Sequence, residues 1–395
     1  MILDCVRRAS RVTNIARDDW RPEPPSDRER FIRLVARHGV GWSVASALQN
    51  HTSGPEFRKI HAWLHNLRSQ NAVLALTLLH ELYRIVERLR AGEIRCLVVK
   101  GLPLSQIGYG DLAARRVKDL DLLVSGSEFD AAVDLLHRFG YRDAIPQLWM
   151  PRHVLELRHP ETGNIIDLHR DMMPLHFPRT LNVENLWARR ARVRMGPVDV
   201  DVPGIEDTVV LLAAHGAKHG WVRLEWLLGF SRLALMSTVN WDAVMGRSRQ
   251  LRYERAVRLA VNLSMDLLQT PMPDWVERWS HADRAASKLS RDAGMRLRAG
   301  ETSGGDERFA WSHVRALDSG RDGLRYLAMS AWYPSEGDEL AIPRLRQHRG
   351  VMVCARPVRL AGRVIRRLWT RRTIGRVPVG VAGTAKRDPG ATSMG

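Results

Sequence analysis

The sequence RRVKDLDLLV, residues 115–124, places two aspartates one residue apart inside a run of leucines and a valine. Its apolar half predicts a strand, in which side chains two apart point to the same face. Asp119 and Asp121 then project together, while Leu120 and Leu122 face a core on the other side. Two neighbouring carboxylates repel each other unless a cation neutralises them. The stretch therefore predicts a strand that presents a carboxylate pair to a divalent cation such as Mg²⁺.

A third acidic residue occurs in a similar context further along the chain. The sequence NIIDLHR (164–170) predicts another strand, and it carries Asp167 between apolar residues, with His169 on the same face. Three carboxylates on neighbouring strands are the ligand set of a two-metal site for phosphoryl or nucleotidyl transfer. An Asp-x-Asp pair by itself is a weak signal, because most charged residues at strand ends are solvated.

The segment before the aspartate pair supplies a possible phosphate cradle. VVKGLPLS (98–105) predicts the end of a buried strand, then Lys100 and Gly101, then the start of a helix. Free N–H groups at a helix N-terminus favour anions, and a glycine lets a phosphate approach the backbone closely. The alternative for Lys100 is an ordinary surface lysine, although the chain has only six lysines against 55 arginines.

Together the three motifs resemble the DNA polymerase β-type nucleotidyltransferase superfamily. They are more closely similar to a bacterial family of uncharacterised nucleotidyltransferases, which carries Lys-Gly where better-known members carry Gly-Gly or Gly-Ser. The resemblance spans about residues 25–370. The matching positions are Lys100, Gly101, Leu104, Arg115, Asp119, Asp121, Asp167 and His169.

The resemblance implies that Asp119, Asp121 and Asp167 bind two Mg²⁺ ions, with Mn²⁺ as a substitute. It implies transfer of an NMP from an NTP such as ATP to a hydroxyl or phosphate acceptor, with release of pyrophosphate. The acceptor is left open among a peptide, a metabolite and RNA. The residues implied to contact the nucleotide and its phosphates are Lys100, Gly101, Arg115 and Lys218.

A further part of the resemblance is HGAKHGWVRLEWLLGFSRL (215–233), which predicts helices beside the cleft. His215 and His219 lie four residues apart on one helix face, so they are cleft candidates together with His169. A metal-binding role for the pair lacks an acidic third ligand at a convincing spacing, and histidines packed beneath the cleft are the favoured alternative. Relatives carry an aspartate where this chain has Gly229.

The periodicity along the chain predicts an α+β fold, in which a small mixed β-sheet nucleotidyltransferase core is flanked by helices. N-terminal helices precede the core, with one or two long helices over Glu56–Arg90, and the C-terminal half is helical. Residues 153–170 predict a hairpin, residues 190–203 predict a second hairpin or, given Pro197, an edge pair, and residues 300–307 predict a linker. The expected regions are an N-terminal helical region (1–92), the core (93–203), a helical domain completing the cleft (204–299), a C-terminal helical region (308–372) and a disordered basic tail (373–395).

Composition limits the setting and the partners. The formal net charge is +18, and residues 344–387 contain 13 Arg or Lys and no acidic residue. A helix over 356–372 would present arginines to an anionic membrane or nucleic acid, unless it simply docks on the body. Three scattered cysteines, no signal peptide and no transmembrane stretch predict a cytoplasmic protein.

Two other functions are compatible with these motifs. The first is a non-catalytic protein that binds nucleotides or nucleic acid on the same scaffold; three intact aspartates argue against it. The second is a toxin- or resistance-type nucleotidyltransferase that acts on tRNA or a small molecule. The sequence does not distinguish such an acceptor from a peptide or a metabolite.

Overall fold

The computed structural model describes residues 1–10, 22–50, 54–144, 153–178, 182–300, 306–333, 351, 353–360 and 362. The chain divides into two compact units, Met1–Met329 and Ser330–Gly395. The described part combines a mixed five-stranded sheet with many helices, so the predicted α+β class is confirmed. The tail at 373–395 lies outside the described residues, as does most of the linker expected at 300–307.

Four helices precede the sheet. They are α1 (Ile2–Ser10), α2 (Arg28–His38), α3 (Gly41–Leu48) and α4 (Pro55–Ala91). The Asp27 side chain caps α2 by accepting from the Arg30 amide, and Gly39 ends it at φ 68°. The segment predicted as one or two helices is the single 37-residue helix α4.

The five-stranded sheet has the order β1-β2-β5-β4-β3, with β2 and β5 parallel and the other neighbours antiparallel. The strands are β1 (Cys96–Val98), β2 (Asp119–Val124), β3 (Arg142–Asp143), β4 (Val154–Arg158) and β5 (Ile165–His169). Between them lie α5 (Leu102–Tyr109), the 3₁₀ turn η1 (Leu112–Ala114) and α6 (Phe129–Arg138). The predicted strand DLDLLV and the predicted β4–β5 hairpin are confirmed.

The second predicted hairpin is also present, as a separate two-stranded sheet. Helix α7 (Val183–Ala188) leads into β6 (Ala191–Met195), which pairs antiparallel with β7 (Val198–Val202). Pro197 lies in the turn between the two strands, where its missing N–H interrupts no ladder.

The described chain after β7 is helical. It contains α8 (Ile205–Lys218), α9 (Leu224–Ala234), α10 (Trp241–Gln250), α11 (Glu254–Leu268), α12 (Asp274–His281), α13 (Arg284–Ala299), α14 (Asp306–Ala316) and α15 (Gly320–Trp332). Residues 353–360, within the second unit, are helical as well. None of the helices in the described ranges is both long and apolar enough to cross a membrane.

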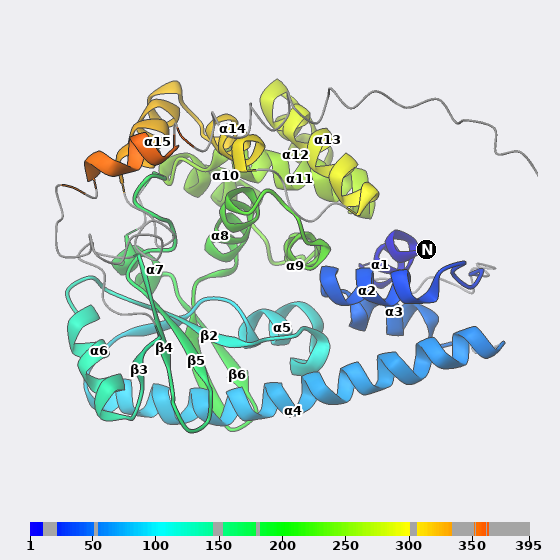
Figure 1. Cartoon of the computed structure of the whole chain (residues 1–395), viewed down its shortest axis with the longest axis horizontal. Coiled ribbons are helices and arrows are strands. Elements are labelled where there is room, and N and C mark those ends of the chain that lie inside the picture. The colour runs from blue at the N-terminus through cyan, green and yellow to red at the C-terminus, as the bar shows by residue number, and fades with distance from the viewer. Residues whose placement is uncertain are drawn as a thin grey trace, which may run out of the picture. The chain divides into compact units, whose positions relative to one another are not determined.

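Helix α4 belongs to both of the large hydrophobic cores. Its N-terminal half, through Phe57, Ile60 and Leu64, packs in the core formed by α1–α3 and the helices from α8 onward. Its C-terminal half, from Ala75 to Leu89, packs in the core of the sheet. At about 1.5 Å per residue the helix is roughly 55 Å long, and Figure 1 shows it running beneath the sheet and α1–α3.

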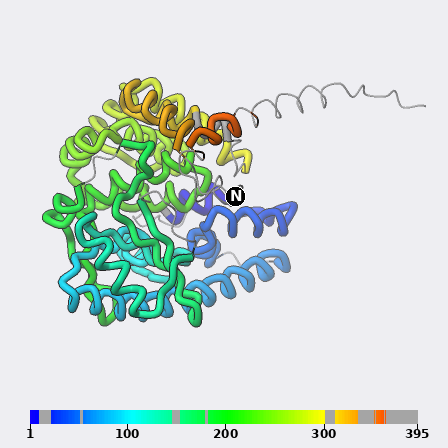
Figure 2. The backbone as a smooth tube through the Cα atoms, turned by 60° about the vertical axis from the view of Figure 1, so that its left-hand side comes forward, coloured from blue at the N-terminus to red at the C-terminus, as the bar shows by residue number. Residues whose placement is uncertain are grey.

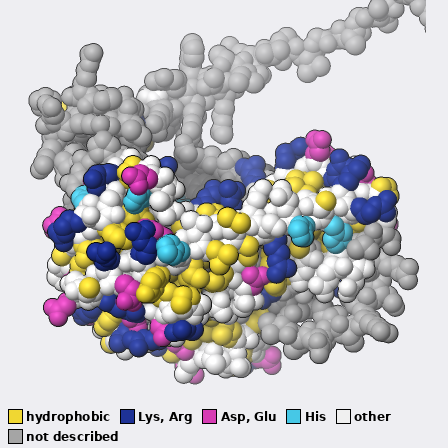
Figure 3. All heavy atoms as spheres, turned by 90° about the horizontal axis from the view of Figure 1, so that it is seen from below, with side chains coloured by type: hydrophobic (Ala, Val, Ile, Leu, Met, Phe, Trp, Pro, Cys, Tyr) yellow, Lys and Arg dark blue, Asp and Glu magenta, His cyan; other side chains and the backbone are white. Residues whose placement is uncertain are grey.

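The outer side of α4 carries exposed apolar residues. Figure 3 views the molecule from this side and shows hydrophobic side chains gathered near the middle. Val73, Leu76 and Tyr83 of α4 are exposed. The backbone trace in Figure 2 shows the same helix at the lower edge of the first unit.

The two faces of the sheet differ in what covers them. Leu120, Leu122 and Val124 of β2 point into the core that contains α4 and α6. On the opposite face Leu123 of β2 and Leu97 of β1 join a smaller apolar cluster, with Leu186 of α7 and Leu211 of α8. The aspartates of β2 lie on this second face, next to a cavity, as the alternation in DLDLLV predicts.

Candidate active site

The strand register brings the predicted acidic residues together. Asp121 of β2 lies directly opposite Asp167 of β5 in the parallel pair, and Asp119 is one pleat away from Asp121. Asp119, Asp121 and Asp167 all line one cavity. On the other side of β5, Glu156 of β4 lies opposite Asp167, which adds a fourth carboxylate that the motifs did not indicate.

Asp121 is buried and already balanced by neighbouring groups. The Lys100 ammonium donates to its Oδ1 at 2.8 Å, and His169 Nε2 lies 3.0 Å from the same oxygen. Burial alone would raise the pKa of Asp121, but the Lys100 charge and the His169 contact outweigh it and hold the pKa well below its usual range. Asp121 is therefore ionised at neutral pH.

Within the described part of the chain, Asp119 and Asp167 form no ion pair of this kind, and burial and neighbouring charges set their protonation. Burial and the charge of Asp121 raise the pKa of Asp119. For Asp167, burial with the charges of Asp121 and Asp119 raises the pKa to about 7. Carboxylates that resist ionisation side by side are the groups that gain most from a bound cation.

The donor atoms fit a divalent cation. Ligand atoms of Asp121, Asp167 and His169 all lie within 4.8 Å of one another. His169 Nδ1 is buried and has no hydrogen-bond partner among the described residues, so its hydrogen-bonding capacity is unsatisfied. Carboxylate oxygens suit Mg²⁺ and Mn²⁺. Asp119 is not in this group, although it lines the same cavity; His169, by contrast, was expected only as a cleft residue.

Lys100 and Gly101 lie between β1 and α5, where the sequence places them. Gly101 precedes α5 with φ 59°, and a Cβ at this position would come 3.1 Å from Val117 Cγ1. The left-handed backbone and the close approach of Val117 together explain the glycine. Both residues line the cavity beside the aspartates, so the N-terminus of α5 opens toward the carboxylate pair.

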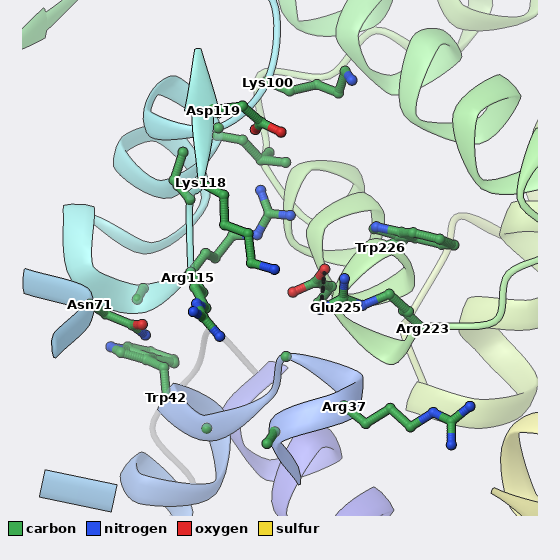
Figure 4. Close-up of a pocket in the computed structure, with 18 of the residues that line it drawn as sticks. Arg37, Trp42, Asn71, Lys100, Arg115, Lys118, Asp119, Arg223, Glu225 and Trp226 are labelled. Carbon is green, nitrogen blue, oxygen red and sulfur yellow. Dashed lines mark ion pairs between the residues drawn. The ribbon is translucent and has the colours of Figure 1, made fainter. Parts of the chain in front are cut away.

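The cavity has a volume of about 640 Å³, within the range of roughly 300–1,000 Å³ that is usual for small-molecule sites. Its walls come from the sheet, from α8 and α9, and from the N-terminal helices α2, α3 and α4. Figure 4 shows Lys100 and Asp119 at one end, Trp42, Asn71 and Arg37 at the other, and Arg115 and Trp226 between them.

The turn after α8 is built by the HGAKHGW sequence. Gly220 has φ 60°, and the amide of Trp221 donates to the Gly216 carbonyl, which ends the helix. A Cβ at Gly216 would lie 2.4 Å from the Trp221 ring, and that ring is fully buried. Glycine at position 216 is therefore required for the tryptophan to pack against α8.

His215 and His219 pack against each other and against Trp226. Their ring centroids lie 4.6 Å apart, and each ring contacts the Trp226 indole at 5.4 and 5.2 Å. Burial and the Lys100 charge hold the pKa of His215 well below its usual value, and burial lowers that of His219 to about 3. Both are neutral side chains of the cavity wall, and neither belongs to the metal-binding group found among the described residues.

Two basic residues implied to bind phosphate occupy different positions. Arg115 follows η1 and lines the cavity, and its buried Nε has no hydrogen-bond partner in the part of the chain that the structure describes. Lys218 ends α8 and is not among the cavity-lining residues. Burial and the Lys100 charge lower the pKa of Lys218 to about 8, which still leaves it mostly protonated at neutral pH.

Several cavity residues have no signal in the motifs. Trp42 and Asn71 come from the N-terminal helices, and Arg223 and Glu225, which lie inside the 215–233 motif but were not singled out there, pair at 3.1 Å on the opposite wall. Gly229 lies in α9, where a Cβ would meet Leu104 at 3.3 Å. An aspartate there would press against α5, so this chain uses the position for close helix packing.

Comparison with known proteins supports the chemistry of this site. The model of a family described as "Uncharacterised nucleotidyltransferase" matches residues 24–269, more than half of the chain. The chain belongs to this nucleotidyltransferase family. The matched region of the nucleotidyltransferase contains all three aspartates, the Lys100–Gly101 pair and the α8–α9 wall. No curated protein and no solved structure matches the chain.

Proposed function

We propose that this nucleotidyltransferase transfers an NMP from an NTP to a hydroxyl or phosphate of an acceptor and releases pyrophosphate. The observation that carries the proposal is the parallel register that sets Asp121 opposite Asp167, inside a cavity that also contains Lys100 and the start of α5. Family membership supports transferase activity. The NTP substrate and the pyrophosphate product are both polyanions, which explains the basic side chains around the carboxylates.

Asp119, Asp121 and Asp167 would hold two Mg²⁺ ions, or Mn²⁺ in their place. When bound, such ions supply Lewis-acid stabilisation of the charge on the transferring phosphorus and the leaving pyrophosphate. His169 supports these three ligands, because its Nε2 lies 3.0 Å from Oδ1 of Asp121 and would hold that carboxylate in place. With a nitrogen free of hydrogen bonds, His169 would also serve as a ligand in place of Asp119.

The β- and γ-phosphates of the NTP would lie at Lys100 and the α5 N-terminus. Lys100 would provide a point charge, and the amides of Leu102 and Leu104 in the first turn of α5 would provide donors, while Pro103 between them has no N–H. Lys218 adds positive potential from the end of α8. Arg115, with its unpartnered Nε in the same cavity, completes the predicted nucleotide contacts.

Finer features of the proposal come from the sequence. ATP as the donor, a cytoplasmic bacterial setting and membership of the Lys-Gly branch stay predictions. The acceptor, a peptide, a metabolite or RNA, stays open, and the basic C-terminal stretch is proposed to contact an anionic surface. The five expected sequence regions are also kept as a proposal for how the chain is organised.

A labelling experiment tests the function. Purified full-length protein is incubated with Mg²⁺, each α-labelled NTP in turn and a cell extract, and products are identified by mass spectrometry. We expect transfer of one NMP to a single class of acceptor, lost in Asp121→Asn and retained in the control Glu161→Gln, an exposed turn residue. Mg²⁺-dependent NTP binding without transfer would instead indicate the non-catalytic alternative, and absence of both would refute the proposal.

A further inference from the structure

Figure 4 shows Trp42 and Asn71 toward the end of the cavity away from Asp119, with Arg115 next to them on the way to Lys118; these three residues are here called the α3–α4 corner. Trp42 comes from α3, Asn71 from α4, and Arg115 directly follows η1. The turn η1 packs on both α3 and α4, which brings the three residues to one part of the cavity wall. None of them belongs to the metal group or to the start of α5.

Asn71 has the clearest signature of a ligand contact. Its side chain is 9% exposed, it lines the cavity, and its amide makes no hydrogen bond to any residue that the structure describes. Buried polar groups in native proteins are nearly always hydrogen-bonded. An amide offers one donor group and one acceptor, so its missing partner should present a mixed edge of acceptor and donor atoms.

Trp42 presents a fixed indole beside this amide. Its Nε1 donates to Asp111 at 3.3 Å, the Arg232 guanidinium lies 4.9 Å from the ring centroid, and Tyr109 packs edge-on at 5.3 Å. Asp111 is itself held by capping η1 at the Ala113 amide. The indole is therefore held in place before any ligand arrives, and its remaining surface lines the cavity.

Arg115 contributes a planar guanidinium group to the corner. Its Nε is buried without a hydrogen-bond partner, and it forms no ion pair with any described residue. Many other arginines of the described chain are paired, such as Arg189 with Asp207 at 2.9 Å. An indole surface, a free amide and a guanidinium plane are the groups with which proteins stack on a nucleobase and read its edge.

We propose that the α3–α4 corner binds the base of the NTP and that Asn71 determines which base is preferred. The inference rests on the proposed function, because it places the triphosphate at Lys100 and the aspartates. The nucleoside then extends along Lys118 and Arg115 toward α3 and α4, as the order of residues in Figure 4 allows. The N-terminal helices thus act as the base-binding wall of the cavity.

The test compares nucleotides with a probe that lacks a base. Binding of the non-hydrolysable α,β-imido analogues of ATP, GTP, CTP and UTP, and of inorganic tripolyphosphate, is measured calorimetrically on the full chain with Mg²⁺. We expect at least one analogue to bind about tenfold or more tightly than tripolyphosphate, with clear differences among bases. Asn71→Ala should weaken the preferred analogue about tenfold and reduce those differences, with tripolyphosphate binding unchanged.

Matched variants separate this role from a structural one. Asn66→Ala removes an exposed asparagine of the same helix and should change nothing. Asn71→Asp keeps the side-chain size but replaces the donor by an acceptor, so it should change the order of base preference. Trp42→Leu should weaken all four analogues, while the control Trp275→Leu, at a 39% exposed residue, should not. Melting temperatures show which variants are folded.

Two results would overturn the inference. Folded Asn71 and Trp42 variants that bind every analogue as the wild type does would show that the corner serves the acceptor or nothing. Wild-type protein that binds all analogues and tripolyphosphate equally would show that no base is read. If the wild type binds neither the analogues nor tripolyphosphate, the proposed function fails as well, which distinguishes the two failures.

Discussion

The ammonium of Lys100 forms an ion pair with Asp121, its Nζ 2.8 Å from Oδ1, at the edge of a cavity lined by two further aspartates. One carboxylate of three is therefore balanced by the chain itself. Burial and repulsion from the Asp121 charge raise the pKa of both Asp119 and Asp167. A bound divalent cation would relieve this repulsion and so stabilise the folded protein.

The aspartate pair should be essential for transfer and dispensable for folding. Asp119→Ala and Asp121→Ala are each expected to lower NMP transfer by about 10²-fold or more, because charge stabilisation at the phosphorus is lost. Circular dichroism and melting temperature should stay close to those of the wild type. A folded variant of either aspartate with unchanged transfer would contradict the metal-pair hypothesis.

The raised pKa of Asp167 predicts a pH-dependent cost in stability. Asp167 titrates near 3.8 in the unfolded chain and at about 7 in the folded protein. Between these values the folded state binds more protons, so the free energy of unfolding falls as the pH rises and the full cost is present above pH 7.

At pH 8 in EDTA, the free energy of unfolding of Asp167→Asn should therefore be about 1–3 kcal/mol higher than that of the wild type. The variant should accordingly unfold at a higher urea concentration. The difference should shrink as the pH falls through 3.8 and disappear well below it, where both states are protonated. Urea titrations at the two pH values measure it. A variant that is less stable than the wild type at pH 8 would show that Asp167 is not under this repulsion.

Divalent cations should stabilise the folded protein at the carboxylate site. Mg²⁺ or Mn²⁺ at about 100 times its Kd is expected to add roughly 2.7 kcal/mol to the free energy of unfolding, reversibly with EDTA. Asp121→Asn should abolish the thermal shift. The control Asp134→Asn, at an exposed position on α6, should retain it; equal shifts in both variants would place the ions elsewhere.

Glycine at position 216 should be required for stability. Gly216→Ala would place a Cβ 2.4 Å from the buried Trp221 ring, and overpacking of this kind costs about 1–3 kcal/mol. The matched control is Gly246→Ala within α10, where a Cβ meets nothing within 4 Å. This control should be stabilised by up to about 1 kcal/mol, since alanine favours a helix over glycine. Chemical denaturation of both variants decides between these outcomes.

The basic C-terminus gives a separate prediction about binding. Full-length protein should bind anionic liposomes or RNA in low salt and lose them as salt rises, because Arg and Lys side chains supply the attraction. A truncation after Gly350 should lose this binding and keep transfer. Equal binding by both forms would show that the C-terminal arginines do not bind the anionic partner. They would then be solvated or packed against the rest of the protein.

The sequence predicts features that depend on neighbouring residues better than features that depend on contacts between distant parts of the chain. DLDLLV and the β4–β5 hairpin follow from alternation and a turn sequence, which are local signals, and both are present. The register of Asp121 with Asp167 is a contact between strands that lie far apart in the chain. Two strands of similar pattern suggested that contact without specifying it.

The cavity wall opposite the sheet shows where sequence reasoning stops. Trp42 and Asn71 precede the motifs by dozens of residues, and no spacing rule connects them to the aspartates. Their place depends on how α4 packs against η1, which is a tertiary property. The same holds for the Lys100–Asp121 ion pair, since the sequence alone assigned Lys100 to phosphate.

The continuity of α4 through both hydrophobic cores fixes a rotational phase between them. Each residue of an α-helix turns the chain by about 100°, so an inserted residue near Ser69 would redirect Asn71 and every later side chain of α4 relative to α1–α3. The helix could then satisfy one core or the other, but not both. The uninterrupted backbone of α4 therefore fixes the orientation of one half of the cavity relative to the other.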